Sequence, residues 1–201
     1  MPARIVDVRR FHGAEIAPYV SDLARLRIAV FRDFPYLYDG SLAYEERYLQ
    51  TYLSAPRSVA VLAFDGDDVI GASTGIPLED ETPDFQAPFA VSGHAVAEIF
   101  YCGESVLNAA YRGRGIYRQF FEGRERHAKD LGSFVTSAFC AVERSADHVL
   151  RPPGYEPLDD VWAHFGYVRH PELTTTFEWK DVDCRTETEK TMVFWLKDLR
   201  S

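Results

Sequence analysis

The sequence predicts an α/β or α+β domain of three layers, in which helices cover both faces of a central mixed, twisted sheet. Helix-like and strand-like segments alternate in mixed order along the 201 residues. The run 58–64 is almost wholly apolar, as expected of a strand that is covered on both faces. Near the middle, a strand leads through a glycine-rich turn into a helix. We find no internal repeat or long linker, so we expect a single domain over residues 1–201.

Two helices are expected in the first quarter of the chain. From Ile16 to Phe34, apolar residues recur at steps of three and four, which predicts an amphipathic helix that Pro35 ends. A second, short helix is expected over 41–53, with Ser41 as its N-cap.

Strands are expected next. Segments 58–64 and 69–76 should pair as a hairpin through the turn at Asp65 to Asp68. The acidic, proline-containing segment 78–88 is expected to be a loop. A long strand is predicted over 96–107, bulged at Gly103.

The second half continues the mixed pattern. The expected order is a helix over 116–131, a buried strand over 134–141, a loop over 143–156, a short helix over 158–165 stopped by Gly166, and strands over 174–182 and 191–196.

Composition excludes several classes of function. A net charge of −9 argues against a nucleic-acid partner, because phosphate binding requires clustered Lys and Arg. Cys102, Cys140 and Cys184 form no CxxC pair and have no metal-ligand spacing with His, so we expect reduced thiols in a cytoplasmic protein and no metal site. No run approaches the ~20 apolar residues of a membrane span, so no membrane association is expected.

The glycine-rich turn has the features of a phosphate site. Gly113 and Gly115 allow the backbone to approach a ligand closely. The first N–H groups of the following helix have no intrahelical partner and lie at its positive end. Arg112 and Arg114 add positive charge beside them.

The segment Arg112-Gly113-Arg114-Gly115-Ile116-Tyr117 resembles the Gln/Arg-x-x-Gly-x-Gly/Ala motif of the GNAT superfamily of N-acetyltransferases, except that Tyr117 replaces Gly or Ala. The runs 107–112 and 162–167 are also similar to family patterns, and the resemblance is specific over 106–121. It implies that the turn binds the pyrophosphate of acetyl-CoA, and that backbone groups of Ser105, Val106 and Leu107 pair with the pantetheine amides. The Tyr117 side chain either narrows this pyrophosphate site (the phosphate cradle, residues 113–117) or points away from it and packs at the adenine end of the ligand.

The resemblance also implies a general base on the strand before the turn. Glu104 is favoured because it is close to the expected reaction centre. Glu98 is the second candidate because Ala97-Glu98-Ile99 matches the Ala-Glu-Ile sequence pattern of the family. In the family, the acid that protonates the leaving thiolate is usually a Tyr in the helix before Gly166. Trp162 occupies that place here, and an indole cannot supply a proton usefully at neutral pH.

The aromatic region between the first two helices walls the acceptor site in the family. Tyr36 and Tyr38 are the best candidates for substrate binding, since they follow Pro35 and fit no helical period. The acidic segment 79–84 could attract a cationic amine, although a solvated loop is the simpler interpretation.

The resulting hypothesis is an acetyl-CoA-dependent N-acetyltransferase that acts on a primary amine of a small molecule by direct attack. The alternative is a non-catalytic acyl-CoA-binding or sensor module. A nucleotide-binding P-loop is disfavoured, because no Lys-Ser/Thr pair follows the glycines. The last two strands could offer an edge for a homodimer.

Overall fold

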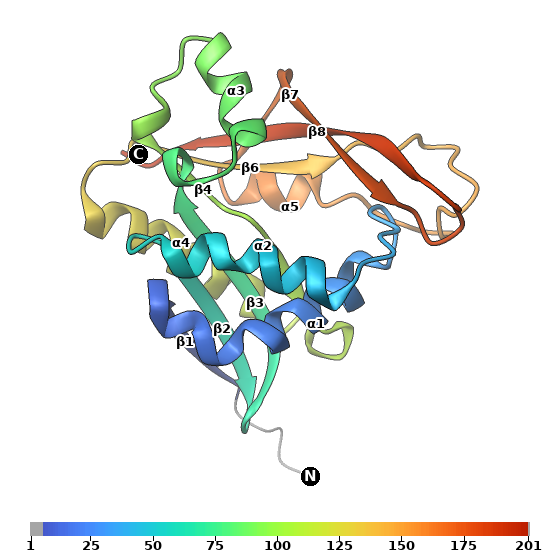
Figure 1. The fold of residues 1–201 in the computed structure, drawn as a ribbon, viewed down its shortest axis with the longest axis horizontal. Coiled ribbons are helices and arrows are strands. Elements are labelled where there is room, and N and C mark those ends of the chain that lie inside the picture. Colours follow the sequence, from blue (N-terminus) through green and yellow to red (C-terminus); the bar gives the residue numbers. More distant parts are fainter. Residues whose placement is uncertain (1–5, 201) are drawn as a thin grey trace.

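The computed structural model describes residues 6–200, which form an eight-stranded mixed sheet with helices on both faces (Figure 1). Its strand order is β1-β2-β3-β4-β6-β8-β7, and β5 pairs with β3. The strands are β1 Asp7–His12, β2 Val59–Asp65, β3 Asp68–Pro77, β4 Ile99–Tyr101, β5 Ser105–Leu107, β6 Thr136–Val142, β7 Val168–Lys180 and β8 Glu187–Asp198. The α-helices are α1 Val20–Phe31, α2 Leu42–Ser54, α3 Pro83–Val91, α4 Ile116–Leu131 and α5 Asp159–His164.

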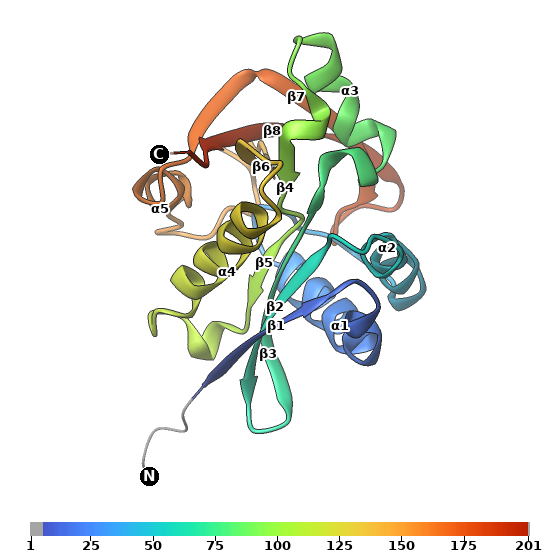
Figure 2. The same cartoon turned by 90° about the vertical axis from the view of Figure 1, so that its left-hand side faces the viewer.

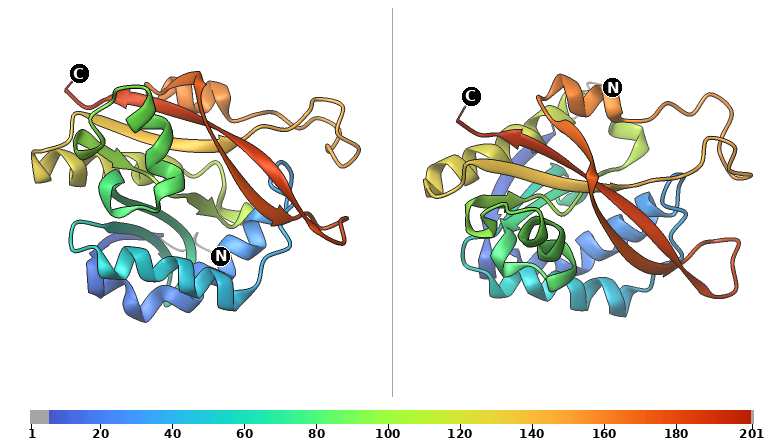
Figure 3. Two further views of the ribbon diagram at one scale, coloured as in Figure 1. Left: turned by 45° about the horizontal axis from the view of Figure 1, so that its top comes forward. Right: turned by 90° about the horizontal axis from the view of Figure 1, so that it is seen from above.

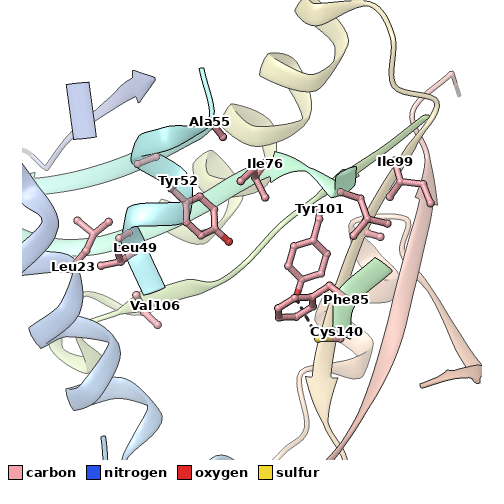
Figure 4. Packing of buried hydrophobic residues seen from close by; sticks show 14 of the residues in the cluster. Leu23, Leu49, Tyr52, Ala55, Ile76, Phe85, Ile99, Tyr101, Val106 and Cys140 are labelled. Carbon is pink, nitrogen blue, oxygen red and sulfur yellow. Dashed lines mark hydrogen bonds between the residues drawn. The ribbon is translucent and has the colours of Figure 1, made fainter. Parts of the chain in front are cut away.

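The sheet separates two apolar cores, and the predicted fold class is confirmed. Helices α1 and α2 lie on one face of the sheet, and α4 lies on the other (Figure 2). Along β2, Ala60 and Leu62 pack in the core beneath α1 and α2, whereas Val59 and Val61 pack in the core beneath α4. Figure 4 shows part of the first core, with Leu23 and Leu49 against the sheet. Because side chains alternate between faces, a strand with two covered faces must be apolar throughout.

Several local predictions are confirmed by backbone geometry. Ser41 caps α2, since its Oγ accepts a hydrogen bond from the Tyr44 N–H at 3.3 Å. Gly66 in the β2–β3 turn has φ +67°, a conformation that favours glycine. Helix α4 has the predicted bounds and ends at Gly132, which has φ +75°.

Other parts of the prediction are wrong. The helix predicted from Ile16 to Phe34 is shorter, because a 3₁₀ turn at Gly13–Tyr19 occupies its start and α1 already ends at Phe31. Segment 78–88 is not a loop, since it contains a 3₁₀ turn and most of α3. Pro83 occupies the first helical position, where the missing N–H of proline costs nothing.

The long strand predicted over 96–107 is broken in the middle. Strand β4 lies between β3 and β6, pairing in parallel with Thr136–Ala138 of β6. After the break at residues 102–104, β5 pairs with β3, while β6 continues beside β8. The sheet therefore opens between β5 and β6, on the side where α4 begins.

Loops from three parts of the chain meet at one end of the molecule: the α1–α2 connection, segment 143–158 and the β7–β8 turn (Figure 3). Tyr38 forms an isolated bridge with Asp181. Arg144 pairs with Asp181 at 2.8 Å and donates hydrogen bonds to the carbonyl oxygens of Pro35 and Tyr36. Within residues 6–200, no helix combines the length and apolar character needed to cross a membrane.

Replacing Gly75 with Ala should destabilise the protein by about 1–3 kcal/mol, because over-packing a dense core forces side chains and backbone to shift. A Cβ at Gly75 would lie 2.4 Å from Cε1 of Phe100. Urea unfolding of G75A measures the loss. Combining G75A with Phe100→Leu should cost less than the sum of the two single changes, and strict additivity would contradict the proposed contact.

Candidate active site in the opened sheet

A pocket of about 90 Å³ lies where β5 and β6 separate. Residues 102–105 form one wall and residues 139–141 the other. Side chains from both faces of the sheet line the pocket. On the side of α1 these are Phe31 and Tyr36. On the side of α4 they are Tyr117, Phe121, Arg124, Leu158 and Trp162.

Glu104 is the carboxylate of this pocket, and only 5% of the residue is exposed. Its Oε2 accepts a hydrogen bond from Nη1 of Arg27, whose Nε donates to Glu45. Its Oε1 is buried and has no hydrogen-bond partner within residues 6–200. A carboxylate held by an arginine on one oxygen and unoccupied on the other can accept a proton from a substrate.

Glu98, the second predicted base, lies elsewhere. It ends a 3₁₀ turn before β4 and is exposed, and its carbonyl accepts a hydrogen bond from the Val135 N–H. On an unbroken strand, residues 98 and 104 would share a face, because side chains alternate with a period of two. The break at 102–104 removes that relation, so the structure does not bring Glu98 to the pocket.

Arg124 also belongs to the pocket. It lies in the third turn of α4 with 2% of its surface exposed. Its Nη1 donates to Ser73 Oγ at 2.7 Å, to Ser105 Oγ at 2.6 Å and to the Glu104 carbonyl at 3.2 Å. These bonds fix β5 at the point where it leaves β6.

Two cysteines line the pocket, Cys102 and Cys140. Burial raises the pKa of both thiols, that of Cys140 to about 12. Both are therefore protonated at neutral pH, and a thiol is a poor nucleophile compared with a thiolate. This environment disfavours a covalent intermediate on cysteine.

The predicted tyrosines divide between the pocket and its surroundings. Tyr36 lines the pocket with its ring 4.5 Å from that of Phe31, and burial raises the pKa of its phenol. Tyr38 is not a lining residue, and its ring packs edge-on against Trp179 at 6.5 Å.

Tyr117 turns from the start of α4 into the pocket. Its hydroxyl accepts a hydrogen bond from Trp162 Nε1 at 3.2 Å, and its ring packs edge-on against Phe121. Burial raises the pKa of the Tyr117 phenol, while the Trp162 hydrogen bond opposes this, so the hydroxyl keeps its proton at neutral pH. The space beside Gly113 and Gly115 is open. If either glycine carried a Cβ, only atoms of its adjacent residues would lie within 4 Å of it, so the Tyr117 side chain does not fill this space.

The start of α4 has the open geometry that a phosphate requires. Gly113 and Gly115 have φ +75° and +76°, and no side chain caps the helix. The N–H groups of residues 116–118 precede the first backbone bond of the helix, from Gln119 N–H to the Gly115 carbonyl. Arg112 and Arg114 are exposed beside them, and Arg114 also donates to the Ala110 carbonyl at 3.0 Å.

Strand β5 has one free edge facing the opening. Thr74 N–H donates to the Glu104 carbonyl, and Asn108 N–H donates to the Ile70 carbonyl. In an antiparallel pair, every second residue directs its backbone N–H and C=O groups to the partner strand. The backbone groups of Val106 therefore point to β3, like those of Glu104 and Asn108. The N–H and C=O groups of Ser105 and Leu107 point away from β3. These two residues can therefore pair with an extended ligand in the gap.

The sequence matches no known protein-family model and no curated protein. Solved structures are nevertheless similar over nearly the whole chain. An N-acetyltransferase from Staphylococcus aureus Mu50 superposes with a TM-score of 0.60 at 12% identity, covering 97% of this chain and 99% of its own. A putative acetyltransferase of the GNAT family from Desulfovibrio desulfuricans gives 0.59 at 11% identity, covering 97% and 99%. The chain has the GNAT fold.

Another structural neighbour is an aminoglycoside 6'-N-acetyltransferase complexed with coenzyme A, which superposes with a TM-score of 0.58 at 14% identity. It covers 96% of this chain and 97% of its own.

Replacing Arg27 with Met should destabilise the protein by about 3–5 kcal/mol, because Glu45 and Glu104 would remain buried without their cation. Thermal or urea unfolding measures the change. Arg25→Met is the matched control on the same helix, since Arg25 forms a surface pair with Asp22 and should cost less than about 1 kcal/mol. Equal losses in the two variants would contradict a buried charge network.

Proposed function

We propose that this protein transfers an acyl group from an acyl-CoA, with acetyl-CoA as the simplest donor, to a primary amine of a small molecule. The observation that carries the proposal is one pocket with two complementary features. A buried carboxylate with an unoccupied oxygen, Glu104, reaches it from the α1 side. An uncapped helix start with a glycine-rich turn leads into it from the α4 side. The GNAT fold and the CoA-bound neighbour support this reading.

In this proposal the pyrophosphate of the donor lies on the turn from Gly113 to Tyr117. The free N–H groups of Ile116 and Tyr117 and the helix dipole stabilise its negative charge. Arg112 and Arg114 add charge-assisted hydrogen bonds. The pantetheine arm follows the free edge of β5, pairing with the backbone of Ser105 and Leu107, while the apolar side chain of Val106 anchors the strand in the core.

The amine enters past Phe31 and Tyr36, which line the pocket on the side of Glu104. Glu104 Oε1 accepts a proton from the amine, directly or through a water. The amine nitrogen bonds to the thioester carbon, and the C–S bond breaks to release a thiolate. The hydroxyl of Tyr117 is protonated and Tyr117 lines the pocket, so it can donate its own proton to the thiolate. Water then reprotonates the Tyr117 phenolate, and Glu104 releases the proton of the amine to solvent. The protonated state of Cys102 and Cys140 supports direct attack.

Removing the two turn arginines together, Arg112→Ala with Arg114→Ala, should weaken CoA binding about tenfold or more, because each contributes charge beside the phosphates. Isothermal titration with CoA at low salt measures the effect, which should shrink as salt is added. The control is Arg25→Ala with Arg47→Ala, which removes the same charge from exposed sites on α1 and α2. If the wild-type protein shows no CoA binding, the proposal is wrong.

Glu104→Gln should lower kcat by a factor of roughly 10² to 10⁴ with the best donor and amine, since a positioned base contributes about that much. CoA affinity should change little, because Glu104 lies on the side of the sheet opposite to the cradle. Wild-type binding of CoA without turnover on a broad amine panel would instead favour a non-catalytic acyl-CoA-binding or sensor module.

A further inference from the structure

Arg124 is a buried cation to which no carboxylate within residues 6–200 is hydrogen-bonded or ion-paired. Within residues 6–200, its three hydrogen bonds all come from Nη1 and end on two hydroxyls and one carbonyl, while Nε is buried without any partner. No ion pair joins Arg124 to a carboxylate in that part of the chain. Burying an isolated charge costs several kcal/mol, so side chains in such positions are normally paired.

The nearby acidic groups are already engaged. Glu104 and Glu45 pair with Arg27, and Glu125 pairs with Lys197 at 2.6 Å. Arg27 does not line the pocket and is shared between two carboxylates, whereas Arg124 lines the pocket and pairs with no carboxylate within residues 6–200. Arg124 is also held rigidly, between the Ser73 and Ser105 hydroxyls and the ring of Phe121, whose centroid is 4.6 Å from its Cζ. A fixed guanidinium loses little freedom when it binds a carboxylate.

The position of Arg124 along α4 indicates which part of a ligand it meets. Tyr117, Phe121 and Arg124 recur at steps of four and three, so they form one stripe of the helix, and all three line the pocket. Arg124 lies nine positions after Gly115, a rise of about 13.5 Å along the helix. An extended pantetheine arm that starts at the glycine turn can cover this distance and bring its thioester end close to Arg124.

Arg124 and Glu104 approach the pocket from opposite faces of the sheet. The Glu104 side chain bonds to Arg27 on α1, whereas Arg124 comes from α4. If the amine is deprotonated on the Glu104 side, the group that faces Arg124 belongs to the donor and not to the acceptor.

We propose that the transferred acyl group ends in a carboxylate, which pairs with Arg124, so that the preferred donors are short dicarboxylic acyl-CoA thioesters such as malonyl-CoA or succinyl-CoA. This inference rests on the proposed function and names its donor class. Acetyl-CoA then binds through its CoA portion but leaves Arg124 unpaired.

The test compares donors of matched length on the wild-type protein. Succinyl-CoA should bind roughly tenfold or more tightly than butyryl-CoA by isothermal titration, because a hydrogen-bonded charge pair replaces an unpaired charge. The same preference should appear in kcat/KM with a common amine. Equal affinity for the two thioesters, or tighter binding of butyryl-CoA, would overturn the proposal and assign Arg124 to holding β5 alone.

Arg124→Met should reduce the succinyl/butyryl affinity ratio to about one, whatever the change in overall affinity. Arg126→Met is the control, since Arg126 is exposed on the same helix and should leave the ratio at its wild-type value. Because Arg124→Met removes internal hydrogen bonds, circular dichroism and thermal unfolding establish that the variant is folded. If it is not, the wild-type donor comparison decides the proposal.

Two outcomes separate this inference from the function on which it rests. Binding of free CoA with no preference among acyl groups would retain the proposed function and overturn the donor class. No binding of free CoA would overturn the proposed function itself. A preference for acceptor amines that carry a carboxylate, lost in Arg124→Met without any donor preference, would also overturn the donor assignment.

Discussion

The divergence of β5 from β6 is the constraint on which the site depends. Strand β4 pairs on both sides, with β3 and β6, but after residues 102–104 the chain keeps only its partnership with β3. Gly103 lies at the break and lets the backbone pass close to Tyr52, because a Cβ there would lie 2.0 Å from the Tyr52 hydroxyl. Without the break, β5 would remain hydrogen-bonded to β6, and neither a pocket nor a free strand edge would exist.

Two arginines hold the opened sheet from its two faces. Arg27 bonds to the Glu104 side chain, and Arg124 bonds to the Glu104 carbonyl and the neighbouring Ser105 hydroxyl. Charged groups therefore fix the break, although burying them costs free energy that apolar residues would not have cost. The use of charged groups is explained if they also act on ligands. Arg27 leaves one oxygen of Glu104 without a hydrogen bond, and Arg124 has no carboxylate partner within residues 6–200.

The parts of the fold that could be predicted are those in which local chemistry agrees with the tertiary structure. Helix α4 has its glycine boundaries and its apolar stripe, and Ser41 is a strong N-cap. Strand β1 was missed because it is an edge strand with exposed charged residues, and it lacks the apolar run of β2. Helix α3 was missed because its two prolines and the acidic residues at 79–84 suggest a loop, although Phe85 and Phe89 place it against the core.

Only part of the candidate site could be predicted from the sequence. Local patterns indicate the glycine turn and Glu104. The choice between Glu98 and Glu104, however, depends on a strand break that results from pairing with β3 and β6. Arg27 lies 77 residues from Glu104, so no local spacing could connect them. Arg124 did leave a signal, since it continues an otherwise aromatic stripe on α4 at the spacing of Tyr117 and Phe121. A charge within a buried helix face is unusual enough to indicate a function.

Tyr117 shows how a departure from a motif can be accommodated elsewhere in the structure. At the last position of the glycine motif, a bulky residue would obstruct the cradle if its ring lay over the turn. Instead, the ring packs against Phe121 and the hydroxyl meets the Trp162 indole N–H. Trp162 is not an acid at neutral pH, but its indole N–H orients the Tyr117 hydroxyl, which stays protonated until a thiolate forms beside it. Tyr117 on α4 and Trp162 on α5 thus line the same pocket and are joined by a hydrogen bond.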